Sequence, residues 1–252
     1  MNLSSWFEAG RDDNRPDVLW EDGERIFCRT WRADGDGGRQ ELMAVVPAAE
    51  HPTPGSINRL IHEYGLREYL DSEWAVRPLE LVNERGRTAL LFEPPQGQPL
   101  DRFITLPMEM GRFLQLAISM MVALGRVHRR GLVHKDLKPV NILVDPATDR
   151  VGLTGFGIAS RLVRERQSPE PPELIAGTFA YMAPEQTGRM NRSIDSRSDL
   201  YSLGVVLYQM ITRALPFSAS ERWSGSTAIL RECRCRRLSG WATSQLRSRR
   251  SS

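Results

Sequence analysis

Lysine is nearly absent from this chain of 252 residues, because arginine supplies all but two of its 34 basic side chains. The two lysines are Lys135 and Lys138, three residues apart near the middle of the sequence. No lysine precedes them, so chemistry that depends on a lysine in the first half of the chain is excluded. An arginine could supply the charge there, but with a planar guanidinium in place of a compact ammonium group.

Cysteine and long apolar runs are also scarce. Cys28, Cys233 and Cys235 form neither a disulfide framework nor a zinc-binding spacing. The sequence has no stretch of 18 consecutive apolar residues that would predict a transmembrane helix. The first 16 residues are rich in charge and lack the apolar block of a signal peptide. We therefore expect a cytoplasmic protein without a membrane segment.

Basic charge is concentrated at one end of the chain. Residues 221–252 hold eight arginines against two glutamates, whereas residues 1–220 hold 26 basic and 29 acidic side chains. The body of the protein is therefore mildly acidic. It lacks the basic surface that nucleic acid requires, so we expect no nucleic-acid binding by the folded body.

The sequence does contain a decapeptide, from His134 to Leu143, that carries three chemically distinct side chains in a fixed order. Asp136 can accept a hydroxyl proton, Lys138 can neutralise a phosphoryl group, and Asn141 can bind a metal ion through its amide oxygen. This order and spacing are those of a protein-kinase catalytic loop. We therefore predict Asp136 and Lys138 as catalytic residues, and Asn141 as a ligand of the cofactor and its metal.

Three further segments follow the decapeptide at distances that suit a kinase. They are a Thr-Gly-Phe-Gly segment, an Ala-Pro-Glu segment and the start of an apolar helix, at residues 154–157, 183–185 and 199–204. On these motifs the chain resembles the serine/threonine protein kinases over about residues 20–220. More narrowly, it is similar to the N-terminal kinase-like domain of bacterial hybrid proteins that also carry an ATPase module and a sensor histidine kinase.

The resemblance implies an α+β fold with two lobes, a small β-rich lobe and a larger helical lobe that is incomplete at its C-terminal end. We assign residues 1–15 to an N-terminal extension, 16–95 to the small lobe, 96–220 to the large lobe and 221–252 to a basic tail. Apolar periodicity agrees with this order. It predicts strands at 18–32, 40–46, 75–82 and 88–93, a helix beginning at Pro54, and helices over 113–127 and 200–211.

The nucleotide-binding half of the resemblance is poor. A kinase anchors ATP with a lysine on its third strand, which pairs with a glutamate of the following helix. Glu63 stands at the place of the glutamate, but Pro47 falls near the place of the lysine. Arg39 is the nearest cation along that strand, but we do not expect it to replace the lysine. Glu63 is then left unpaired or bound to another arginine.

The predicted metal site is incomplete. Gly155 replaces the aspartate that would bind the metal, which leaves Asn141 as the recognisable ligand. Mg²⁺ generally requires one or two carboxylates besides phosphate oxygens. Asp145 lies four residues beyond Asn141, but it fits better in a turn between two strands.

The phosphate cradle and the hinge are altered as well. The first strand pair encloses Glu21–Glu24, where one glycine stands among three acidic residues that would repel a triphosphate. At the hinge, Glu93 offers a backbone contact to adenine, but Pro95 lacks the N–H group for the second one. The resemblance implies ATP and Mg²⁺ as cofactors, with Asn141, Glu63 and Glu93 in binding roles. The losses imply that this binding is weak or absent.

We interpret the body as a pseudokinase, a regulatory module with a protein partner. Two alternatives stay open: a weakly active serine/threonine kinase, and a non-functional truncated fragment of a hybrid signalling kinase. The fragment interpretation depends on residues 221–252, which lack helical or strand periodicity. A shifted reading frame over suitable synonymous codons resembles the expected continuation of the hybrid relatives. We therefore favour a disordered, out-of-frame tail over a basic arm that binds an acidic partner.

Overall fold

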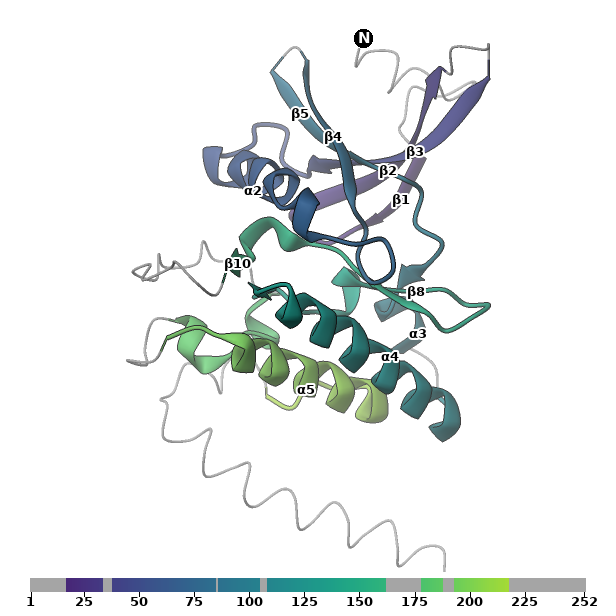
Figure 1. Cartoon of the computed structure of the whole chain (residues 1–252), viewed down its shortest axis with the longest axis vertical. Coiled ribbons are helices and arrows are strands. Elements are labelled where there is room, and N and C mark those ends of the chain that lie inside the picture. Colours follow the sequence, from purple (N-terminus) through teal and green to yellow (C-terminus); the bar gives the residue numbers. More distant parts are fainter. Residues whose placement is uncertain are drawn as a thin grey trace, which may run out of the picture.

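The computed structural model describes residues 17–33, 38–84, 86–104, 108–161, 178–187 and 193–217. In this part of the chain a twisted sheet with one helix lies above a larger helical body (Figure 1). The predicted α+β fold with a β-rich small lobe and a helical large lobe is confirmed. The predicted N-terminal extension and basic tail lie outside the described residues.

The small lobe is a five-stranded antiparallel sheet with the strand order β1-β2-β3-β5-β4. Its strands are β1 (Asp17–Glu21), β2 (Arg25–Ala33), β3 (Arg39–Pro47), β4 (Pro78–Glu84) and β5 (Arg87–Phe92). The stretch 18–32, predicted as a strand, is therefore divided into two strands. The division falls at Gly23, whose φ of +87° suits glycine in the tight turn.

The register between β2 and β3 decides which side chain enters the space below the sheet. Arg25 lies directly opposite Pro47, and Phe27 lies opposite Val45. Residues directly opposite each other in an antiparallel pair point to the same face of the sheet. Arg25 therefore projects from the face on which a side chain at position 47 would stand.

Helix α2 (Pro54–Gly65) packs against the sheet and begins at the residue that the sequence predicts. The Oγ1 atom of Thr53 caps it by accepting the N–H of Ser56 at 3.2 Å, and Pro54 is well tolerated in the first turn. The helix buries Leu60 against the sheet, and Glu63 on the same side is only 1% exposed. In Figure 1, α2 lies between the sheet and the loop that leads to β10.

The large lobe is organised around two helices, α4 (Met110–Arg129) and α5 (Ser196–Thr212), which lie side by side (Figure 1). A buried stripe of α4 enters the main apolar core, as predicted, through Leu116, Met120, Leu124 and Val127. By length and composition α4 could cross a membrane, and it is the one such helix among the described residues. One such helix is weak evidence for a membrane span, because a core helix passes the same test and one stripe of α4 lies in the apolar core.

Short elements connect these parts. They are η1 (Arg67–Tyr69), β6 (Gln98–Pro99), α3 (Asp101–Ile104), β7 (Leu132–Val133), η2 (Pro139–Asn141), β8 (Ile142–Val144), β9 (Val151–Leu153), η3 (Phe156–Ile158), β10 (Ser160–Arg161), η4 (Thr178–Ala180) and η5 (Pro184–Thr187). The predicted catalytic loop lies between β7 and β8, below the sheet.

Helix α5 is not buried on all sides, although its sequence is apolar nearly all round. Leu203, Val206 and Met210 are buried in the core, whereas Leu200 and Ile211 are 55% and 58% exposed. Within the described residues, therefore, one face of α5 packs on the large lobe and a neighbouring apolar face does not.

Candidate functional site

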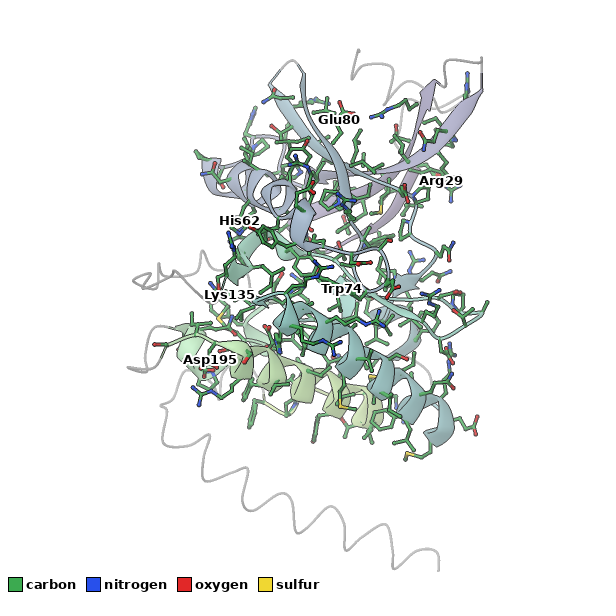
Figure 2. The ribbon with its side chains drawn as sticks, viewed as in Figure 1. Arg29, His62, Trp74, Glu80, Lys135 and Asp195 are labelled. Carbon is green, nitrogen blue, oxygen red and sulfur yellow. The ribbon has the colours of Figure 1, made fainter. Side chains whose placement is uncertain are left out.

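The loop from His134 to Asn141 is fixed by buried polar contacts at its base. The carboxylate of Asp199, on α5, accepts the backbone N–H groups of His134 and Lys135, both at 2.8 Å. The same carboxylate lies 2.9 Å from the Nε2 atom of His128. Lys135 has the left-handed φ of +68°, which a non-glycine residue adopts only when its surroundings hold it there. Figure 2 shows Lys135 in the loop above the N-terminal end of α5.

His134 packs and forms hydrogen bonds inside the loop. Its side chain is fully buried against Phe156, with ring centres 4.5 Å apart. The Nδ1 atom accepts the N–H of Asp136 at 3.2 Å, so the Nε2 atom donates to the carbonyl of Thr154 at 3.0 Å. Both ring nitrogens are engaged with the backbone, which orients Asp136.

The three predicted site residues of the loop lie together. The Nζ atom of Lys138 is 3.2 Å from the Oδ2 atom of Asp136. The amide nitrogen of Asn141 donates to that same oxygen at 2.9 Å and to the carbonyl of Asp136 at 2.8 Å. The other carboxylate oxygen of Asp136 is buried and accepts no hydrogen bond from the described residues. The loop therefore keeps one carboxylate oxygen available to a hydroxyl donor.

The cation that approaches this loop from the small lobe is Arg25, a residue that the motif comparison missed. Its side chain is 11% exposed, and its Nη2 atom donates to the Oδ1 atom of Asn141 at 2.9 Å. The Nη1 atom lies 3.6 Å from a carboxylate oxygen of Glu63. Position 25 could have been found from the sequence by pairing β2 with β3, because Arg25 faces Pro47 across the two strands.

Arg39, the nearest cation along the third strand, does not replace the missing lysine. Arg39 is exposed at the outer end of β3, where it pairs with Ala33. Pro47 lies eight positions further along the strand, which corresponds to about 26 Å of extended chain. Its side chain therefore cannot reach the catalytic loop, and the guanidinium beside Glu63 comes from β2.

Glu63 is bound to the backbone as well as to this arginine. Its Oε1 atom accepts the N–H groups of Gly155 and Phe156, each at 3.1 Å. It thus connects α2 to the segment where a kinase carries its metal-binding aspartate. The labelled His62 lies at the same junction in Figure 2 and is 2.7 Å from the carbonyl of Ala159.

Besides lacking a carboxylate, Gly155 has a backbone conformation and surroundings that leave no space for a side chain. Its φ of +86° lies in the left-handed region that favours glycine. A Cβ atom at this position would lie 2.6–2.8 Å from the side-chain atoms of Asn141, closer than real contacts allow. The side chain of Asn141 therefore fills the space that an aspartate at position 155 would need.

The residues present do not fit a magnesium ion. The amide oxygen of Asn141, the predicted ligand, already accepts a hydrogen bond from Arg25. No group of three acidic, histidine or cysteine side chains suited to a metal occurs in the described part of the chain. The positive charge beside Asn141 is a guanidinium supplied by the protein itself.

The turn between β1 and β2 reaches the same place. The Oδ1 atom of Asp22 accepts the N–H groups of Glu24 and Arg25 at 3.0 and 2.7 Å. Its Oδ2 atom accepts two hydrogen bonds from Arg25, at 2.9 and 2.6 Å, and lies 3.9 Å from the Nζ atom of Lys138. The side chain of Asp22 is fully buried. Glu24 instead points to α2, where Arg59 donates to both of its carboxylate oxygens at 2.5 Å.

The charges of this cluster determine its protonation. Burial alone would raise the pKa of Asp22, but the cations of Arg25 and Lys138 outweigh burial and hold this pKa below its ordinary value of 3.8. Burial would likewise lower the pKa of Arg25, but Asp22, Glu63 and Asp136 together raise it. Both groups are therefore ionised at neutral pH.

Acid is expected to remove the contribution of Asp22 to stability. A carboxylate whose folded-state pKa is lowered stabilises the fold above its ordinary pKa, and this contribution is lost as the pH falls through the folded-state value. The difference in urea midpoint between the wild type and Asp22→Asn should be constant from about pH 7 to pH 5 and should shrink below pH 3.8. A difference that stays unchanged down to about pH 3 would contradict the assignment of the ionised state.

The hinge is tightly packed near its C-terminal end. Glu93 is exposed, and Pro95 offers no backbone donor, as predicted. A Cβ atom at Gly97 would come within 2.9 Å of the backbone of Val144 on β8, so this position requires glycine. The role of Glu93 in holding a cofactor stays a prediction.

Two lobes with an Asp-Lys-Asn loop between them define a kinase-like protein. The family model described as the protein kinase domain matches residues 40–250 of the chain. The matched range continues into residues 221–250, which lie outside the described residues. The chain belongs to the protein kinase domain family.

Curated relatives of the chain include bacterial serine/threonine kinases. The chain is 30% identical over 217 residues to the serine/threonine-protein kinase pkn2 of Myxococcus xanthus, covering 80% of this chain and 26% of that protein. It is 38% identical over 135 residues to Pkn1 of the same organism, covering 52% of this chain and 19% of Pkn1. It is 36% identical over 126 residues to PknB of Mycobacterium tuberculosis, covering 50% of this chain and 20% of PknB. The chain thus spans about a quarter or less of these relatives.

Proposed function

We propose that this chain is a pseudokinase of the serine/threonine type, which acts as a regulatory interaction module rather than as a phosphotransferase. The observation that carries the proposal is the hydrogen bond from Arg25 to the amide oxygen of Asn141. In a phosphotransferase that oxygen would bind Mg²⁺, which bridges and neutralises the phosphates. Here a protein cation holds it, and Gly155 brings no second metal ligand.

The remaining site residues support the same proposal. Asp22, Glu63 and Asp136 place three buried or largely buried carboxylates around Arg25 and Lys138. With more negative than positive charge, this cluster should repel a triphosphate rather than attract it. Removal of one electrostatic contact at a reacting centre costs on the order of 10²- to 10³-fold in rate, and several contacts are altered together.

The wild-type protein is expected to bind no Mg·ATP at millimolar concentration. Because ligand binding to the folded state raises its stability, binding would increase the melting temperature. We expect a change of less than about 1 °C with Mg·ATP, close to the scatter of a thermal melt. An increase of several degrees that disappears when EDTA removes the metal would overturn the proposal.

A weakly active kinase is the second candidate, and one observation favours it. The buried Oδ1 atom of Asp136 has no partner among the described residues and could accept the proton of a substrate hydroxyl. Phosphate incorporation into a generic protein substrate decides between the two functions. Asp136→Asn, which keeps the size of the side chain, serves as the background. Incorporation by the wild type above that background would establish activity.

The cellular setting is part of the proposal. We propose a protein partner in a signalling pathway, a cytoplasmic location, and an origin in a hybrid kinase that also carries an ATPase module and a sensor histidine kinase. The third alternative, a truncated out-of-frame fragment, depends on residues outside the described part of the chain. The genomic DNA around codon 221 tests it directly, because a frameshift would leave the continuation readable in another frame.

A further inference from the structure

The buried cluster between the lobes contains two charges with no place in ordinary phosphoryl transfer. One is the guanidinium of Arg25, which contacts Asn141 and Glu63. The other is the carboxylate of Asp22, which contacts Arg25 and lies 3.9 Å from Lys138. Both side chains start in the small lobe, whereas Asn141 and Lys138 belong to the large lobe.

We propose that Asp22 and Arg25 form an intramolecular plug: Arg25 takes the place of the metal and Asp22 takes the place of the phosphate. The plug holds the two lobes closed without nucleotide and hides a metal-independent anion site made by Arg25 and Lys138. This inference concerns the charges that Asp22 masks, so it is tested separately from the binding of Mg·ATP to the wild type.

The geometry of Asp22 goes beyond the needs of its turn. Its Oδ1 atom alone accepts the two backbone N–H groups that shape the turn, at 3.0 and 2.7 Å. The Oδ2 atom is free of that task and is directed at Arg25 and Lys138. An anion between two cations, fully buried and donated by the glycine-poor loop, occupies the position that a phosphate oxygen would need in order to contact the same pair.

Arg25 lies where it can connect the two lobes without a metal ion. Its guanidinium donates to the amide oxygen of Asn141 and lies 3.6 Å from Glu63. It therefore meets both the residue that would bind the metal and the residue that would pair with the missing lysine. A planar guanidinium has five N–H donors, so it can donate to a carboxylate and to an amide oxygen at the same time. The compact ammonium group of a lysine is less suited to bridging two acceptors in this way.

An ion pair with helix α2 also holds the turn that carries Asp22. Arg59 on α2 donates to both carboxylate oxygens of Glu24, two residues after Asp22, at 2.5 Å. This ion pair is partly exposed, whereas the side chain of Asp22 is fully buried. Glu24 is therefore a matched control: it is an acid of the same turn whose carboxylate pairs with Arg59 on α2.

Binding of inorganic tripolyphosphate in the presence of EDTA tests the plug. We expect the wild type and Glu24→Gln to bind weakly, and Asp22→Asn to bind at least about tenfold more tightly, because a like charge is removed from a buried site. The gain should persist without metal and should be lost in the double variant Asp22→Asn with Arg25→Gln. Asp22→Ser, whose hydroxyl can still shape the turn, provides a second variant if the asparagine variant fails to fold.

Three outcomes would overturn the proposal. The first is a folded Asp22→Asn or Asp22→Ser protein with no gain over Glu24→Gln, which would leave Asp22 as a turn residue only. The second is a gain that requires Mg²⁺, and the third is a gain that survives Arg25→Gln. Binding of Mg·ATP by the wild type would refute the proposed pseudokinase function, but it would not by itself produce any of these three results.

Discussion

Asp199→Asn is expected to lower the free energy of unfolding by about 3 kcal/mol or more, the cost of leaving buried donors without an acceptor. The carboxylate accepts the N–H groups of His134 and Lys135 at 2.8 Å and lies 2.9 Å from His128. An asparagine has one side-chain oxygen to accept hydrogen bonds. Its NH₂ group would face the N–H donors that the second carboxylate oxygen of Asp199 accepts. The left-handed backbone of Lys135 then also loses the contact that holds it.

The same chemical change four residues earlier is the control. Asp195 caps α5 by accepting the N–H of Arg197 at 2.9 Å, and asparagine caps a helix as well as aspartate. Asp195→Asn should therefore change stability by less than about 0.5 kcal/mol. Figure 2 shows Asp195 at the start of α5, in the large lobe below Lys135. Equal urea midpoints for the two variants would mean that Asp199 does not hold the catalytic loop.

Much of the fold follows from local patterns in the sequence. Pro54 predicts the start of α2 and the apolar stripe predicts α4, because helix-start residues and periodicity are properties of neighbouring residues. The catalytic loop was predictable because Asp136, Lys138 and Asn141 lie within six residues. In each case the residues that determine the feature lie in one short segment of the sequence.

The site was harder to predict where two distant segments meet. Arg25 and Asn141 are 116 residues apart, and only the strand register and the closure of the lobes bring them together. Glu63 was predicted as a site residue and lies in the site, but its partners are two backbone N–H groups and Arg25 rather than a lysine. The acidic turn was predicted to repel a phosphate, whereas Asp22 itself turns inward and is stabilised by the cations.

The surface of α5 shows a second limit of sequence patterns. Periodicity detects that Leu200 and Ile211 are apolar, but it cannot tell which faces of an apolar helix other segments cover. Both are more than half exposed within the described residues. Burial is decided by the rest of the chain, so an apolar helix does not by itself predict a buried one.

Restoring the missing metal ligand is expected to damage the protein rather than repair it. Gly155→Asp would introduce a Cβ atom 2.6–2.8 Å from the side chain of Asn141, at a backbone φ of +86°. The left-handed conformation alone costs about 1–2 kcal/mol for most residues, and displacement of Asn141 breaks its bonds to Asp136 and Arg25. We therefore expect Gly155→Asp to lower the free energy of unfolding by about 3 kcal/mol or more and to bring no gain in affinity for Mg·ATP.

Gly131→Asp separates the backbone strain from the collision. Gly131 has a similar φ of +73°, but a Cβ atom there would have no neighbour within 4 Å. The free energy of unfolding of this variant should fall by only about 1 kcal/mol, because aspartate tolerates the left-handed region better than most residues. Urea unfolding of both variants measures the two costs, and isothermal titration with Mg·ATP measures any repair. A Gly155→Asp protein that is as stable as Gly131→Asp and binds Mg·ATP would mean that Asn141 is free to move, and that the guanidinium of Arg25 yields its place to a metal.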